Sequence, residues 1–180
     1  SNASFYGGRI VTAASVLSRE SELSVDPLVF IDTADAQLYD QGDESRWNQG
    51  EAQLVSAYIT QHLEDIQDAD NGVIAPYNAQ VDCISAALSA HRPGIEVSTV
   101  DGFQGREKRC ILVSLTRSNE DREVGFAADA RRLNVAVTRA QERLVVVGDG
   151  ACFRAHCRTM IEWLETGLFV DPQGLTSDLG

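Results

Sequence analysis

The sequence predicts an α/β fold, a three-layer arrangement in which a parallel sheet carries helices on both faces. Short apolar runs rich in strand-forming residues alternate with segments whose apolar side chains repeat at helical spacing. That alternation is typical of a parallel sheet, and residues 144–147, apolar at every position, are typical of a strand buried on both faces. With 180 residues and 43% hydrophobic content, the chain is expected to build one core.

The apolar runs and the periodic segments place the expected strands and helices. In chain order they are a strand at 28–32, a helix at 48–67, a strand at 73–77, a helix at 79–90, strands at 96–100 and 110–115, a helix at 131–139, a strand at 144–147 and a helix at 152–164. Asn48, with Glu51 three residues later, matches a capping box at the start of the first helix. Asp129 is the expected N-cap of the third helix.

The domain organisation follows from these elements. The segments are, in order, a tag scar left by protease cleavage at 1–3, an irregular lead-in at 4–27, one folded domain at 28–168 and a flexible tail at 169–180. Residues 33–46, with several carboxylates, are expected to be a solvated loop rather than a metal site, and residues 116–130 are expected to be a mobile surface loop.

The charge balance limits the kind of partner. The chain carries 27 acidic and 15 basic side chains, a net charge of −12, and its single lysine is Lys108. A broadly basic surface that coats nucleic acid is therefore not expected, because phosphate affinity grows with the number of phosphates neutralised. A narrow nucleic-acid groove stays open.

No membrane partner is expected, because no apolar run approaches the roughly 20 residues that span a bilayer and no signal peptide is visible. The predicted location is intracellular, nuclear or cytoplasmic. The four cysteines have no paired spacing, which fits reduced thiols. Cys152, His156 and Cys157 could in principle ligate zinc, but a second cysteine pair is missing, so no metal site is predicted.

A glycine-flanked polar turn follows the strand predicted at 96–100. Ligands gather at the carboxyl ends of parallel strands, which is where this turn falls. Gly102 and Gly105 let backbone approach a ligand closely, while Gln104, Arg106 and Glu107 offer donors and acceptors. The alternative is an ordinary glycine-containing turn with a solvated Arg and Glu.

Two arginines share one face of the helix predicted at 131–139. Arg132 and Arg139 lie seven residues apart, about 700° of helical rotation, so both guanidinium groups could reach one anion. A solvated helix face with local ion pairs is the alternative.

Together these segments resemble the superfamily 1 helicases of the RNA-surveillance and immunoglobulin-mu-binding-protein type. Residues 100–107, Val-Asp-Gly-Phe-Gln-Gly-Arg-Glu, resemble motif V, and residues 131–140, Arg-Arg-Leu-Asn-Val-Ala-Val-Thr-Arg-Ala, resemble motif VI. Residues 73–80 are similar to motif IV, residues 45–51 to the segment before it, and residues 5–8 to the stretch after the first nucleotide-binding half. The likeness covers nearly all of residues 5–165.

The resemblance implies a second RecA-like domain, a P-loop NTPase-type helicase domain that itself lacks the P-loop. It implies that Arg139 is the arginine finger on the γ-phosphate, with Arg132 in the same motif as a second catalytic candidate. Gly105 and Glu107 match positions that line the nucleotide, and Gln104 belongs to the same motif.

The resemblance also implies contacts to single-stranded nucleic acid. The matching positions in motifs IV and V are Tyr77, Asn78, Gln80 and Thr99. An aromatic ring there could stack a base, and a hydroxyl or amide could hold a phosphate. For Tyr77, a core residue at a strand end is an equally good interpretation.

The chain departs from the family in having neither a phosphate-binding loop nor an Asp-Glu pair for magnesium. Those parts belong to the first RecA-like domain of the same chain, which is the implied partner beside single-stranded DNA or RNA. ATP and Mg²⁺ are therefore expected in the full-length enzyme, and none bound stably by this fragment. The alternative is a noncatalytic nucleic-acid-binding or partner-docking module; a stand-alone nucleotide-binding enzyme is disfavoured by the missing loop.

Overall fold

The structure is a computed structural model that describes residues 26–170, 172 and 175. The predicted tag scar, the motif-like residues 5–8 and all but the last two residues of the predicted lead-in lie outside this part of the chain.

Six strands form one sheet in the order β3-β2-β4-β5-β1-β6. They are β1 (Leu28–Asp32), β2 (Asn71–Ala75), β3 (Glu96–Thr99), β4 (Lys108–Ser114), β5 (Ala140–Gly148) and β6 (Leu168–Phe169). Every neighbouring pair in this order is parallel. The predicted parallel sheet is thus confirmed, and β6, placed by the pairing of Leu168 with Val29, is a strand that the sequence did not predict.

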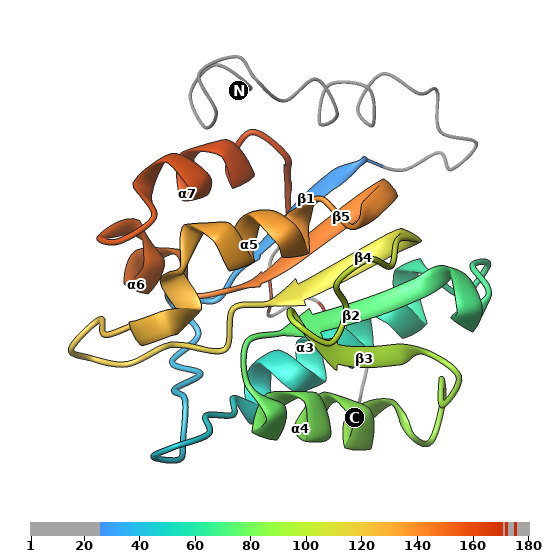
Figure 1. The fold of residues 1–180 in the computed structure, drawn as a ribbon, viewed down its shortest axis with the longest axis horizontal. Helices are drawn as coiled ribbons and strands as arrows, with labels where there is room; N and C mark the ends of the chain where they lie inside the picture. Colours follow the sequence, from blue (N-terminus) through green and yellow to red (C-terminus); the bar gives the residue numbers. More distant parts are fainter. Residues whose placement is uncertain (1–25, 171, 173–174, 176–180) are drawn as a thin grey trace.

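Helices cover both faces of the sheet (Figure 1). They are α3 (Gln49–His62), α4 (Asn78–Leu88), α5 (Ala130–Val137), α6 (Gly150–Arg154) and α7 (Arg158–Leu164), with short 3-10 turns η1 (Asp68–Asp70) and η2 (Gly125–Ala128). Helices α3 and α4 lie on one face, and α5, α6 and α7 lie on the other. The three-layer α/β architecture expected from the sequence is confirmed.

The core is split between the two faces because successive strand residues point in opposite directions. Along β1, Val29 and Ile31 pack with the α3 and α4 layer. Leu28 and Phe30 pack with the α5 to α7 layer. No helix of the described part of the chain is long and apolar enough to span a bilayer.

Both predicted N-caps are confirmed. The Asn48 side chain accepts a hydrogen bond from the Glu51 amide at 3.0 Å, and this starts α3. The Asp129 side chain accepts from the amides of Arg131 and Arg132 at 2.8 and 3.2 Å, and this starts α5. Such caps satisfy amides that have no partner within the helix.

The predicted helices end earlier than expected or are divided; the helix predicted at 79–90 ends at Leu88. The helix predicted at 48–67 ends at His62, and that predicted at 131–139 ends at Val137. The segment predicted as one helix at 152–164 is two, because Cys157 leaves the helical conformation at φ −131° and begins α7.

Both polar loops are largely accessible to solvent, as composition predicted, but a few of their polar groups are buried against each other. The Asp40 side chain is only 1% exposed and accepts hydrogen bonds from Arg117 Nε at 3.1 Å and the Ser118 amide at 2.9 Å. Thr116, Arg117 and Ser118 are buried in turn. These hydrogen bonds link the two loops, and they allow the polar groups of both loops to be buried.

Candidate nucleotide and nucleic-acid site

Glu107 of motif V and Arg139 of motif VI lie where β4 and β5 begin. Lys108 and Ala140 are paired across these strands, and Lys108 N donates to the Arg139 carbonyl at 3.1 Å. Gln141 Nε2 reaches Glu107 Oε2 at 3.5 Å. Glu107 and Arg139 each stand one residue before the paired positions. The fold therefore brings together two residues that are far apart in the sequence.

Arg139 lies just beyond the end of α5. Its Nε donates to the Val135 carbonyl at 3.0 Å, and its Nη2 donates to Thr138 Oγ1 at 3.2 Å. Both bonds fold the half-buried side chain back over the carboxyl end of the helix, where a cation is favoured by the helix dipole. The guanidinium group is thus held against the last turn of α5.

The turn between β3 and β4 crosses the α5 face of the sheet (Figure 1). Phe103 anchors it: the ring is fully buried, and a Cβ on Gly72 would come within 2.7 Å of it. Gly105 has φ +81°, a left-handed conformation that favours glycine. Gln104 and Glu107, on either side, are exposed. An anchored turn with accessible polar side chains suits contact with a ligand from outside the chain.

Arg132 has other partners than Arg139. Its Nη2 forms an ion pair with Asp101 Oδ2 at 2.9 Å, and its guanidinium carbon lies 5.5 Å from the centroid of the Phe126 ring. The two guanidinium groups therefore have no partner in common in this structure, and their joint contact with one anion stays a prediction. Because α5 ends before Arg139, helical phase does not describe the side chain of Arg139.

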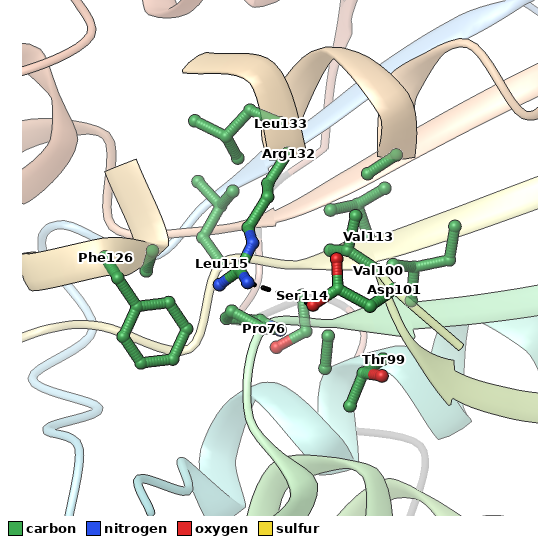
Figure 2. A pocket seen from close by; sticks show the side chains of 14 residues that line it. Pro76, Thr99, Val100, Asp101, Val113, Ser114, Leu115, Phe126, Arg132 and Leu133 are labelled. Atoms are coloured by element: carbon green, nitrogen blue, oxygen red, sulfur yellow. Dashed lines mark hydrogen bonds and ion pairs between the residues drawn. The ribbon is translucent and has the colours of Figure 1, made fainter. Parts of the chain in front are cut away.

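A small pocket of about 30 Å³ lies at the carboxyl ends of β2, β3 and β4. Figure 2 shows Arg132 reaching down from α5 between Phe126 and Asp101, with Thr99 and Pro76 on the strand side. Arg132 and Thr99, predicted for different roles, line this one pocket. This is the edge at which ligands of parallel sheets gather.

The motif IV residues divide into accessible and buried ones. Asn78, the first residue of α4, is exposed. Tyr77 is 5% exposed and belongs to the core, in keeping with its alternative interpretation. Gln80 is fully buried, and its amide bonds the Asn48 amide at 2.7 Å and Ser114 Oγ at 3.0 Å. Contact of Gln80 with nucleic acid stays a prediction; in this structure its amide ties α4 to the start of α3.

A buried carboxyl beside this edge was missed by the sequence analysis. Glu51 is fully buried, and its Oε2 accepts from Ser114 Oγ at 2.7 Å and from the Thr116 amide at 2.8 Å. Thr116 has φ +68°, which is rare for a β-branched residue. Glu51 therefore fixes the strained point at which the chain leaves β4. The one available signal was the capping box, whose usual glutamate bond to the N-cap amide is replaced here by Gln80.

Burial raises the pKa of Glu51 to about 8, against the lowering effect of the hydrogen bonds from Ser114 and Thr116. The folded protein consequently retains a proton that the unfolded chain, with a usual value of 4.5, releases. The resulting stabilisation is fully present below pH 4.5 and is lost as the pH rises through about 8.

We expect Glu51→Gln to remove this pH dependence, because an amide does not titrate. Between pH 5 and 8 the free energy of unfolding of the wild type should fall by about 3 kcal/mol relative to the glutamine variant. Urea unfolding at several pH values measures the difference. A difference that does not change with pH would contradict the raised pKa.

The zinc ligands considered from the sequence, Cys152, His156 and Cys157, do not form a metal-binding group in the described part of the chain. Within residues 26–170, 172 and 175, no group of three or more His, Cys, Asp or Glu side chains is arranged to hold a metal ion.

A three-layer parallel α/β domain with motif V and motif VI residues gathered on one face has the architecture of a RecA-like motor domain. Comparison with known proteins agrees. A family model described as "AAA domain" matches residues 1–151, and the chain therefore belongs to this family.

Its relatives include helicases. The chain is 42% identical over 151 residues to rat DNA-binding protein SMUBP-2, covering 80% of this chain and 15% of that protein. It is 36% identical over 193 residues to the DNA polymerase alpha-associated DNA helicase A of Schizosaccharomyces pombe, covering 97% of this chain and 29% of the relative. It is 35% identical over 168 residues to the Neurospora crassa regulator of nonsense transcripts 1 homolog, covering 84% and 15%.

These relatives are superfamily 1 helicases of the type that the motifs indicated, and that resemblance is confirmed. The chain spans less than a third of their length. A solved C-terminal domain of a "possible DNA helicase" from Lactobacillus has a TM-score of 0.46 at 18% identity, covering 77% of this chain and 81% of that one. At that level the likeness adds nothing to the fold described above.

Proposed function

We propose that this chain is the C-terminal motor domain of an ATP-dependent DNA or RNA helicase, supplying the arginine finger and part of the nucleic-acid groove. The observation that carries the proposal is the placement of Arg139 beside Glu107 at the starts of β4 and β5, next to the exposed turn around Gly105.

The chemistry of phosphoryl transfer suits these residues. The transition state spreads charge over the phosphate oxygens, and a positioned guanidinium group stabilises it. Arginine is better than lysine in this role because its planar fork matches phosphate oxygens. Arg139 would meet the γ-phosphate, and Gln104, Gly105 and Glu107 would line the nucleotide. ATP supplies the phosphoryl group when bound, and the phosphate loop and magnesium ligands come from the first RecA-like domain.

The proposed partners follow from the relatives. The first RecA-like domain of the same chain would face the α5 side, and single-stranded DNA or RNA would cross the carboxyl edge at Asn78 and Thr99. Names that refer to DNA helicase and to nonsense transcripts support a nucleic-acid substrate and an intracellular location, nuclear or cytoplasmic.

The 180-residue chain by itself is expected to hydrolyse no ATP, because half of the site is supplied from elsewhere. Phosphate release, measured with and without single-stranded DNA and RNA, tests this. The full-length protein, measured alongside, should show turnover that nucleic acid stimulates. Robust hydrolysis by the 180-residue chain would refute the division of the site, and a full-length protein that nucleic acid does not stimulate would refute the motor function.

A further inference from the structure

Phe126 is a large hydrophobic side chain left exposed at the ligand edge of the sheet. It is 46% exposed, and in the described part of the chain only Tyr39 and Leu168 join it as exposed large hydrophobics. It stands in η2, between the end of β4 and the start of α5. Exposing an aromatic ring to water is unfavourable, and covering the ring with a ligand would remove this cost.

The backbone on both sides of Phe126 is anchored. Val124 and Ala127, which flank it, are 1% and 5% exposed. The Phe126 ring packs against the buried Tyr77 ring, with centroids 4.6 Å apart and planes tilted by 55°. Little conformational freedom therefore remains to be lost when a ligand covers the exposed part of the ring.

The surroundings of the ring suit a nucleotide. The Arg132 guanidinium lies 5.5 Å from the ring centroid and is oriented by Asp101. Phenylalanine and arginine both offer flat surfaces on which nucleobases stack, and arginine also attracts the phosphate backbone. Thr99, whose side chain carries a hydroxyl, lines the same pocket, and hydroxyl groups are among those that bind phosphates.

The position agrees with the path proposed for nucleic acid. Phe126 lines the same pocket as Thr99 and Pro76, and Pro76 stands two residues before the exposed Asn78 (Figure 2). A strand that passes Asn78 and Thr99 along this edge would bring its next base over the Phe126 ring.

We propose that Phe126 is a stacking platform for one base of bound single-stranded nucleic acid, with Arg132 beside it. The proposal rests on the proposed function and names a contact that the motifs do not include. It also explains why the loop after β4 is held so firmly by Asp40 and Glu51: the loop positions the ring.

The test measures binding of the full-length protein to single-stranded DNA and RNA oligomers of one sequence, each also made with a single abasic residue at successive positions. In the wild type, one abasic position should weaken binding by about 5- to 150-fold. Phe126→Ala should weaken binding of the intact oligomer to a similar extent, and removing the base at that position should then cost nothing more. The parallel DNA and RNA series show whether the stacked base belongs to DNA, to RNA or to either.

Two further variants separate stacking from simple apolar contact. Phe126→Trp should bind like the wild type, and Phe126→Leu, which keeps apolar area without an aromatic face, should bind weakly. Tyr39→Ala is the matched control, since Tyr39 is a comparably exposed aromatic at 50% and should leave affinity within about twofold.

The proposal is overturned if Phe126→Ala binds normally, if Phe126→Leu restores binding, or if the variant loses affinity equally whichever base is missing. The last two results would indicate apolar packing, for example against the first domain. Because the wild type is assayed for nucleic-acid-stimulated ATP hydrolysis in parallel, these results are distinguishable from a failure of the motor function itself.

Discussion

Replacing Arg139 with alanine in the full-length protein is expected to lower nucleic-acid-stimulated ATP turnover by about 10³- to 10⁵-fold. The reason is that the group acts on charge that develops only in the transition state, so kcat should collapse while nucleotide binding is mostly retained. Steady-state hydrolysis together with equilibrium binding of a nucleotide analogue measures the two effects separately. Arg139→Lys should also be poor, because an ammonium group cannot reproduce the planar fork.

The matched control for Arg139 is Arg158→Ala. Arg158 pairs with Glu162 on α7, and its side chain is 79% exposed, so its loss should leave kcat within about twofold. An Arg139→Ala enzyme with near wild-type kcat would remove Arg139 from the finger role.

Replacing Glu51 with alanine is expected to lower the free energy of unfolding of the 180-residue chain by about 3–5 kcal/mol at pH 5. The change leaves Ser114 Oγ and the Thr116 amide buried without their acceptor, at about 1–3 kcal/mol for each orphaned group, and it opens a cavity. The measurement is made at pH 5 because Glu51 is protonated there in the folded protein. At higher pH the raised pKa of Glu51 lowers the stability of the wild type and would reduce the difference. Urea unfolding gives the value.

Two controls bound the Glu51 effect. Glu51→Gln keeps an oxygen that accepts both hydrogen bonds and should stay within about 1 kcal/mol of the wild type at pH 5. Glu64→Ala, at an exposed position just after α3, should change stability by less than about 0.5 kcal/mol. If the alanine variant at Glu51 is as stable as the wild type, the buried network does not hold the end of β4.

The strands could be predicted because their chemistry is local. Residues 28–32 are β1, and residues 144–147 lie within the longer β5; both strands pair with neighbours on both sides, because the apolar runs 28–31 and 144–147 have no polar face to turn toward water. Asn48 and Asp129 were likewise predictable as caps, since the residue that satisfies a helix amide stands beside it in the sequence.

The buried polar groups could not be predicted, because their partners are distant in the sequence. Asp40 is buried on account of Arg117 and Ser118, and no property of its own segment distinguishes it from a solvated aspartate. Glu51 finds Ser114 in the same way. Composition shows that a segment is polar, but only the tertiary structure shows whether its polar groups find hydrogen-bond partners in another segment.

For the candidate site, the motifs named the residues, and the roles of these residues stay predictions. Helical phase gave no indication that Arg132 contacts Asp101 and Phe126, or that the backbone of Arg139 lies beside the start of β4. Phe126 carries no signal in the sequence, because an aromatic residue in a polar loop gives no indication of whether it is buried.

The most direct test of the proposed motor function is trapping of a transition-state analogue by the full-length protein. ADP with aluminium fluoride and magnesium mimics the phosphoryl group in transfer, and it should form a stable complex with the wild type when single-stranded nucleic acid is bound. Arg139→Ala should bind ADP alone as well as the wild type does and fail to trap the analogue. Equal trapping by the two proteins would show that this chain does not complete the active site.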